Sequence, residues 1–145
     1  FSNMVMAYED LDDGLKERLC QMTAVHDIAR VFAKRLKKDP TELHDKYPPM
    51  EHPVIRTHPE TRKKALFVNQ AHSCNFEGWS VAESEGLLNF LYTHQIKEEF
   101  QCRHIWQKGD VAIWDNRCTL HYPVNDYYGH RRLLHRITLK GDKPI

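Results

Sequence analysis

The most informative stretches of this sequence are WDNRCTLH at residues 114–121 and RRLLHR at residues 131–136. Both have the composition of short β-strands, and Lys108-Gly109-Asp110 just before them is typical of a turn. On a strand, Arg132 and Arg136 would share one face, about 13 Å apart. Two guanidinium groups on one face favour recognition of anions, because their planar forks match carboxylate or sulfonate oxygens.

The same residues allow simpler interpretations. The opposite face of the predicted strand is mostly apolar and suits packing against a helix or a second sheet; it carries Leu133, His135, Ile137 and Leu139. A surface strand with two salt-bridged arginines is the plainer alternative, and the pattern alone favours it. His121, taken alone, is more often a structural histidine than a metal ligand. A His-x-Glu match at 58–60 falls in a predicted exposed turn, and we interpret it as chance.

The rest of the chain predicts helices first and closely spaced strands later. Helices are expected around the stripe Leu11, Leu15, Leu19 and Met22, over 26–36, and over 80–95, where Ser80 and Glu83 form a capping box. The proline-rich segment 39–53 is typical of a connector, and 54–57 and 65–69 predict a hairpin. Further strands are expected at 101–106, 111–114, 118–122 and 131–139. This order favours an α+β or mainly β fold.

Composition excludes several classes of protein. The 145 residues suit one domain, and a net charge of +1 gives no electrostatic case for a nucleic-acid or membrane partner. No apolar run approaches the roughly 18 residues of a membrane helix. Four scattered cysteines without CxxC spacing argue against a zinc site and are typical of free thiols in a reducing compartment, so a cytoplasmic protein is expected. A zinc hydrolase is disfavoured because paired ligand spacing is missing.

A family resemblance covers nearly the whole chain. The C-terminal motifs WDNR at 114–117, His121, RR at 131–132, HR at 135–136 and GDKP at 141–144 resemble the end of the TauD/TfdA family. HPVIRTHP at 52–59 and ALFVN at 65–69 are similar to two of its internal segments, and AYE at 7–9 resembles the helix after its GGDT segment. The resemblance implies an Fe(II)- and 2-oxoglutarate-dependent dioxygenase with a double-stranded β-helix, or jelly roll, and flanking helices.

The resemblance also assigns roles to particular residues. His121 matches the distal iron-binding histidine, and Arg132 matches the arginine that pairs with the far carboxylate of 2-oxoglutarate. Arg136 matches the arginine that holds a substrate sulfonate, and Phe32 aligns with an aromatic residue of the substrate pocket. His72 stands where taurine-type members have an aromatic ring, so it is expected to change the polarity around the substrate. Asp115 and Asn116 are expected to tie the turn between strands.

The family's His-x-Asp iron ligands and its GGDT threonine would lie upstream of Phe1. We therefore expect a C-terminal part of one dioxygenase domain, incomplete at its N-terminus, with a helical insert and connector at 1–50 and jelly-roll strands at 51–145. The expected reaction hydroxylates taurine or a related organosulfonate with O₂ and releases sulfite. A truncated, non-catalytic anion-binding relative is the alternative, and homo-oligomerisation is left open.

Overall fold

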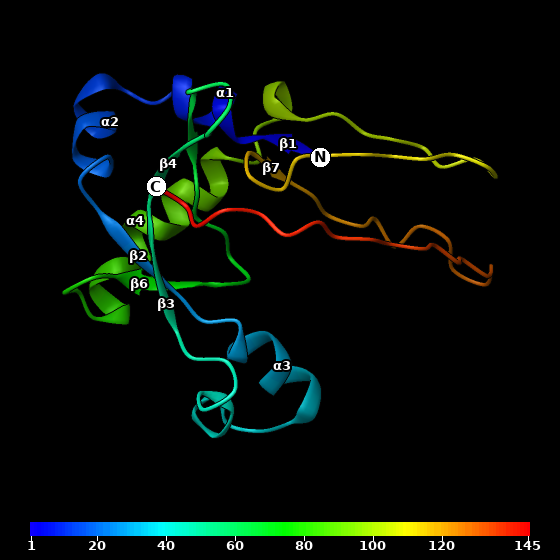
Figure 1. Ribbon diagram of the computed structural model, residues 1–145, viewed down its shortest axis with the longest axis horizontal. Coiled ribbons are helices and arrows are strands. Elements are labelled where there is room, and N and C mark those ends of the chain that lie inside the picture. The colour runs from blue at the N-terminus through cyan, green and yellow to red at the C-terminus, as the bar shows by residue number, and fades with distance from the viewer.

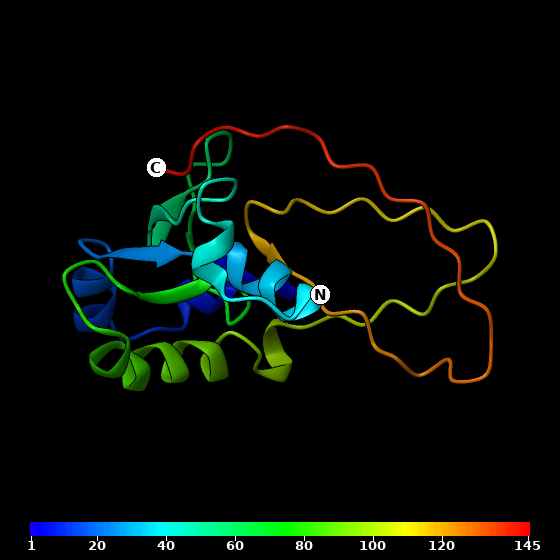
Figure 2. The same ribbon diagram turned by 90° about the horizontal axis from the view of Figure 1, so that it is seen from below.

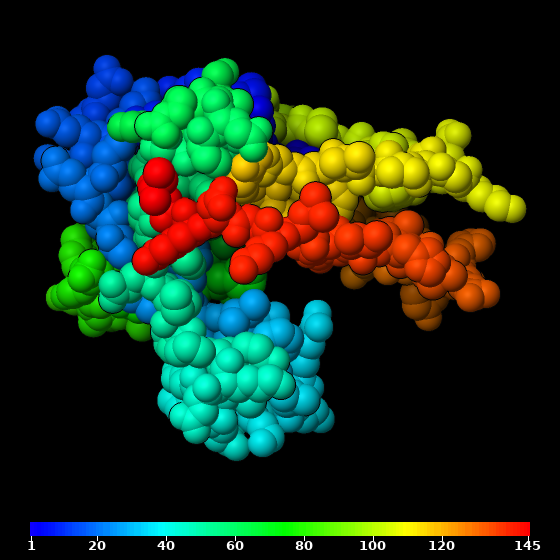
Figure 3. All heavy atoms as spheres, in the orientation of Figure 1, coloured from blue at the N-terminus to red at the C-terminus, as the bar shows by residue number.

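The computed structural model describes all 145 residues as a compact body from which a small lobe and two long arms project (Figures 1 and 3). The N-terminal elements are β1 (Ser2–Asn3), α1 (Met4–Glu9), α2 (Asp13–Leu19), β2 (Thr23–His26), α3 (Ala29–Leu36) and the 3-10 helix η1 (Pro40–Leu43). After them come β3 (Met50–Pro53), β4 (Ile55–Thr57), β5 (Lys64–Leu66), β6 (Ser73–Phe76), α4 (Val81–His94), η2 (Glu98–Phe100) and β7 (Thr119–Leu120). None of the helices is long and apolar enough to cross a membrane.

The strands form three small antiparallel sheets. In the largest, β2 lies between β3 and β6, so that Ala24 is opposite both His52 and Phe76. The predicted hairpin is confirmed, with β4 and β5 paired so that Ile55 faces Leu66. In the third sheet, β1 near the N-terminus pairs with β7, the last strand of the chain.

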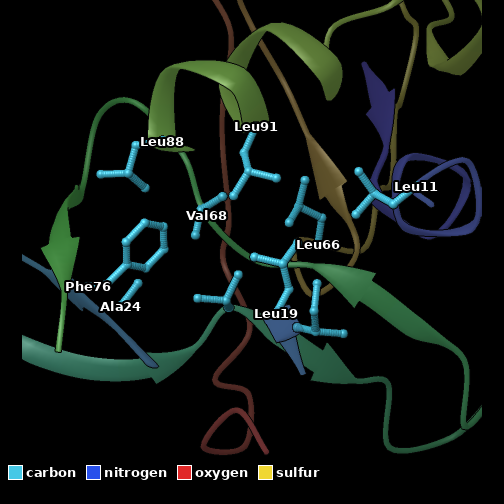
Figure 4. Close-up of a cluster of buried hydrophobic side chains, with 10 residues drawn as sticks. Leu11, Leu19, Ala24, Leu66, Val68, Phe76, Leu88 and Leu91 are labelled. Carbon is cyan, nitrogen blue, oxygen red and sulfur yellow. The ribbon is translucent and has the colours of Figure 1, made fainter. Parts of the chain in front are cut away.

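The main hydrophobic core lies between helix α4 and the strands beneath it (Figure 4). Leu88 and Leu91 of α4 point toward Phe76 and Val68, and both leucines are buried. The core cluster consists of Leu11, Leu19, Ala24, Val54, Ile55, Leu66, Val68, Phe76, Leu88 and Leu91. Burying each large aliphatic side chain contributes about 2 kcal/mol, so this cluster is the main stabilising element of the body.

Helix α4 forms where the sequence predicts it. Ser80 accepts a hydrogen bond from the Glu83 backbone N–H, and the Glu83 carboxylate accepts one from the Ser80 N–H, which confirms the capping box. Two buried polar side chains then fix the helix against the body. The Ser84 hydroxyl accepts from the Phe76 N–H at 3.0 Å, and His94 Nε2 donates to the Ala7 carbonyl at 2.7 Å.

The lobe is built by α3 and η1 and is held by Asp27. The buried Asp27 carboxylate accepts from the Ala29 N–H at 2.9 Å and contacts His44 Nε2 at 3.0 Å. The helix ends at Leu36 as predicted, but it begins at Ala29 and not at His26. His26 instead belongs to strand β2, because residues 23–26 pair with strands on both sides. The predicted connector at 39–53 contains η1 and β3.

The arms differ most from the sequence prediction. Of the strands expected after residue 100, only Thr119–Leu120 is paired, and 101–106, 111–114 and 131–139 run extended without a ladder. Figure 2 shows them as two wide excursions from the body. The predicted apolar back face is exposed, with Ile137 at 90% and Leu139 at 87%. These segments lack strand partners, so the structure is a mixed α/β fold in which the expected jelly roll is not resolved.

Replacing Leu91 with alanine is expected to lower the free energy of unfolding by about 2–5 kcal/mol, because it leaves a cavity in the centre of the core. Phe90→Ala is the matched control on the same helix, since Phe90 is 49% exposed, and it should cost about 1 kcal/mol or less. Urea unfolding followed by circular dichroism measures both. Equal losses in the two variants would contradict the placement of the core.

Candidate functional site

An Asp–His contact connects the first arm to the body. The Asp115 carboxylate lies 3.0 Å from Nε2 of His58, a residue in the turn between β4 and β5. Nδ1 of His58 accepts a hydrogen bond from the Thr61 N–H at 3.2 Å. The ring proton must therefore be on Nε2, which donates to Asp115. His58 is only 5% exposed, so the prediction that this turn is exposed was wrong for its histidine.

Arg117 completes this network. Its Nε and Nη2 donate to the two oxygens of Asp115 at 2.9 and 2.7 Å, and its Nη1 donates to Glu60 at 2.9 Å. The Arg117 guanidinium, and to a smaller extent the His58 hydrogen bond, hold the pKa of Asp115 far below its ordinary range. The carboxylate is thus ionised and fully engaged. This supports the expectation that Asp115 ties the turn, and Asn116 joins it by accepting from Trp114 Nε1 at 2.8 Å.

His121 follows directly after β7, on the exposed surface of the arm. Its ring centroid is 5.1 Å from that of Trp114 and 6.4 Å from that of Phe1. Partial burial lowers the pKa of His121, and the charges of Arg136 and the N-terminal ammonium lower it further. The neutral imidazole that results is the form that binds metal ions.

The two predicted anion-binding arginines are exposed and have no acidic partner. The arginine ion pairs in the structure are those of Arg103 and Arg117. Arg132 instead lies over the ring of Tyr127, with 5.3 Å between its guanidinium carbon and the ring centroid. The plainer alternative of two salt-bridged arginines is therefore not what the structure shows. Both guanidinium groups keep their hydrogen-bond donors free for an anion.

His72 belongs to a second group of aromatic side chains on the sheet. It lies half-buried in the loop before β6, where burial lowers its pKa. Nearby, the ring of His26 stands 5.0 Å from His52 and 5.7 Å from Phe67, and its Nε2 is 3.2 Å from the Ser73 hydroxyl. Burial first, and then the charges of His52 and His72, lower the pKa of His26 to about 4. Sequence reasoning missed His26 and His52, because alternation on a short strand does not mark them as functional.

Phe32 lies in the lobe and packs on Tyr47 with 4.7 Å between ring centroids. This contact gives Phe32 a structural role that needs no ligand. Its expected place in a substrate pocket stays a prediction.

One cluster of metal-ligating groups does not suit a metal ion. Donor atoms of His58, Asp115 and Cys118 lie within 4.8 Å of one another. However, His58 Nε2 carries a proton, and Arg117 occupies both oxygens of Asp115. Burial raises the pKa of the Cys118 thiol, which disfavours the thiolate that a metal needs. The cluster is therefore a hydrogen-bonded joint.

Comparison with known proteins decides the family. Residues 1–138 match the sequence model described as taurine catabolism dioxygenase TauD, TfdA family. The chain belongs to the TauD/TfdA family. The resemblance inferred from the WDNR, His121 and Arg132 motifs is thereby confirmed.

Curated relatives of this chain carry names that point to different substrates. An alkylsulfatase from Acinetobacter baylyi is 39% identical over 98% of this chain and 47% of its own length. An alpha-ketoglutarate-dependent sulfate ester dioxygenase from Pseudomonas putida is 37% identical over 100% of this chain and 50% of its own. An alpha-ketoglutarate-dependent 2,4-dichlorophenoxyacetate dioxygenase from a Burkholderia species is 37% identical over 97% of this chain and 48% of its own length. The chain thus spans about half the length of these relatives.

Solved structures of the family share this fold. A taurine dioxygenase from Burkholderia xenovorans is similar with a TM-score of 0.66 and 32% identity, over 81% of this chain and 37% of its own. The enzyme AAD-2, solved with Mn(II) and N-oxalylglycine, gives a TM-score of 0.65 and 27% identity, over 73% and 42%. The mixed α/β body is therefore a family fold.

The buried His26 predicts a stability that depends on pH. Its folded-state pKa of about 4 lies below the unfolded value of 6.5, so between these values the unfolded chain binds a proton that the folded chain does not. Stability should be full above pH 6.5 and should fall by up to about 3 kcal/mol as the pH drops toward 4. Urea unfolding across this range should show a smaller slope for His26→Gln and the wild-type slope for the exposed control His130→Gln. An unchanged slope in His26→Gln would refute the assignment.

Proposed function

We propose that this protein is an Fe(II)- and 2-oxoglutarate-dependent dioxygenase that hydroxylates a small anionic substrate, taurine or a related organosulfonate, with release of sulfite. Family membership supports the reaction type, and the relatives that use sulfate esters and taurine support an anionic substrate. The observation that carries the proposal is that Arg132 and Arg136, which follow His121 along the chain, have no acidic partners in the structure.

Each residue of the pair has a distinct part in the proposal. Arg132 binds the far carboxylate of 2-oxoglutarate, because a guanidinium fork offers two parallel donors to one carboxylate. Arg136 binds the anionic group of the substrate and so orients the carbon to be hydroxylated. In this proposal 2-oxoglutarate and the substrate bind at separate positions, because each anion pairs with a different arginine.

His121 would hold the iron as one member of a site of two histidines and one carboxylate. Its exposed ring and lowered pKa fit a ligand role, and the remaining two ligands are part of the proposal for the whole protein. Iron, when bound, supplies the activation of O₂ and the oxidation of the substrate. The chain's own contribution is positioning and charge matching.

His72 and Phe32 complete the proposed substrate pocket. His72 offers a half-buried, polar ring where taurine-type members have an aromatic one, and its lowered pKa keeps the ring neutral. A neutral imidazole adds a hydrogen-bond donor and an acceptor without adding charge. This difference favours organosulfonates whose carbon chain carries a polar group.

Arg132→Ala should raise the 2-oxoglutarate concentration needed for half-maximal turnover at least tenfold, since a charge-assisted contact of about 1.5–3 kcal/mol is lost. Arg131→Ala is the control, because it removes an equal charge from the neighbouring position. Succinate formation measures turnover, and the visible absorption of the anaerobic Fe(II)–2-oxoglutarate complex measures binding directly. Unchanged dependence in Arg132→Ala would sink this assignment, and absence of the absorption band in the wild type would favour a non-catalytic anion-binding relative.

Arg136→Gln should raise KM for the organosulfonate at least tenfold and leave the dependence on 2-oxoglutarate unchanged, because only the substrate's anion loses its partner. A panel of taurine, longer alkylsulfonates, an alkyl sulfate and an aryloxyacetate, scored by succinate release, identifies the preferred anion. If Arg136→Gln instead raised the requirement for 2-oxoglutarate, the roles of Arg132 and Arg136 would have to be exchanged.

A further inference from the structure

The contact between His58 and Asp115 joins parts of the chain that are 57 residues apart. His58 belongs to the β4–β5 turn of the body, and Asp115 stands at the base of the arm that leads to His121. We refer to His58, Asp115, Arg117 and Glu60 as the Asp115 clamp. Three of its members are partly or fully buried, and Glu60 lies at its exposed edge, with its side chain 73% exposed.

We propose that the Asp115 clamp is a positioning device for the iron ligand His121, and that His58 and Asp115 act on the reaction only through this histidine. The inference rests on the proposed function and adds to it two residues that touch neither iron nor substrate. It also gives a role to the turn at residues 58–60, which has none in the proposal for Arg132 and Arg136.

The path from the clamp to His121 is short and hydrogen-bonded at each step. The Cys118 N–H donates to the Asp115 carbonyl at 3.3 Å, and the Cys118 carbonyl accepts from the Met4 N–H at 2.9 Å. Thr119 and Leu120 then pair with β1, and His121 is the next residue. The His121 ring lies beside the ring of Trp114, which is the residue directly before Asp115 in the sequence. A rotation of Asp115 therefore moves both the backbone before His121 and the ring beside it.

The strand pairing that supports His121 lies on its N-terminal side. After His121 the chain runs exposed from residue 122 to 143, and no strand pairing holds it. The rigid contacts that join the proposed iron ligand to the body are thus the β1–β7 pairing and, just before it, the clamp. A metal ligand must be held close to its productive geometry, and supporting residues that lose this hold usually weaken metal binding about 10–100-fold.

The chemistry of the clamp suits a fixed joint. Its carboxylate receives donors from two directions, a neutral imidazole N–H on one oxygen and the forked guanidinium of Arg117 on both. Together these contacts fix the plane of the carboxylate, which one hydrogen bond would leave free to rotate. Because the Asp115 charge is already balanced by Arg117, the clamp leaves the two arginines of the proposed site free for their anions.

The test compares Asp115→Asn with Asp110→Asn. Asp110 is a matched control, because it forms a His–Asp contact of 3.1 Å with His104 in the same arm but does not lie on the path to His121. His58→Phe removes the donor to Asp115, whereas His58→Gln keeps an N–H at a similar reach. Two signals are followed: the side-chain NMR resonance of His121, which the Trp114 ring current displaces, and the affinity for Fe(II) measured with 2-oxoglutarate under nitrogen.

We expect Asp115→Asn and His58→Phe to move the His121 resonance toward that of an unstructured histidine and to weaken Fe(II) binding at least tenfold. His58→Gln should restore most of both signals, and Asp110→Asn should change each less than twofold. Circular dichroism shows whether the body stays folded; if Asp115→Asn unfolds it, Arg117→Gln, which keeps the His58 contact, takes its place.

The clamp is rejected if His121 keeps its wild-type resonance in Asp115→Asn and His58→Phe, or if Asp110→Asn displaces it equally. Absence of Fe(II) binding in the wild type is a different failure. It would overturn the proposed function, and the NMR comparison would still decide whether Asp115 positions His121.

Discussion

The carboxylate of Asp115 is the joint on which the functional half of this structure depends. The body is stabilised by its own core beneath α4, but the arms contribute few buried side chains and pair only through β7. The turn before β7 is held by a buried imidazole donor on one side and a guanidinium fork on the other, and β7 itself pairs with β1. In this environment a charge-assisted contact is about twice as strong as a neutral one. The residues proposed for catalysis all follow this joint along the chain.

Local signals in the sequence predicted the elements that are stabilised locally. Helix α4 was predicted with nearly correct bounds because Ser80 and Glu83 satisfy its open end whatever lies around it. The β4–β5 hairpin was predicted because its strands are joined by a short turn. Strand β2 was missed because its four residues lie where one predicted helix ends and the next begins, and they form a strand only through two distant partners. Strand β6 was missed because its four residues, which lie between turns, carry no strong alternation.

The candidate site was predicted only in part, because contacts between residues far apart in the sequence leave no local signal. The positions of His121, Arg132 and Arg136 in a long motif identified the family, which the comparison confirms, whereas their individual roles stay proposals. The His58–Asp115 contact could not be predicted, because nothing local links a hairpin turn to a loop 57 residues later. The strands expected at 131–139 have the right alternation but no partner to pair with. Alternation predicts which face of a strand would be buried, but that face is buried only when the strand pairs with a second strand.

Charge balance connects the fold to the choice of ligand. Arg117 and Asp115 cancel each other, and the lowered pKa values of His121, His72 and His26 leave these histidines neutral near pH 7. Arg132 and Arg136 have no acidic partner in the structure, and in the proposal they match one carboxylate of 2-oxoglutarate and one monoanionic substrate. Sulfonates, sulfate esters and carboxylates all carry that single charge. Choice among them must therefore come from shape and from neutral hydrogen bonds, and His72 is the proposed pocket residue that supplies both.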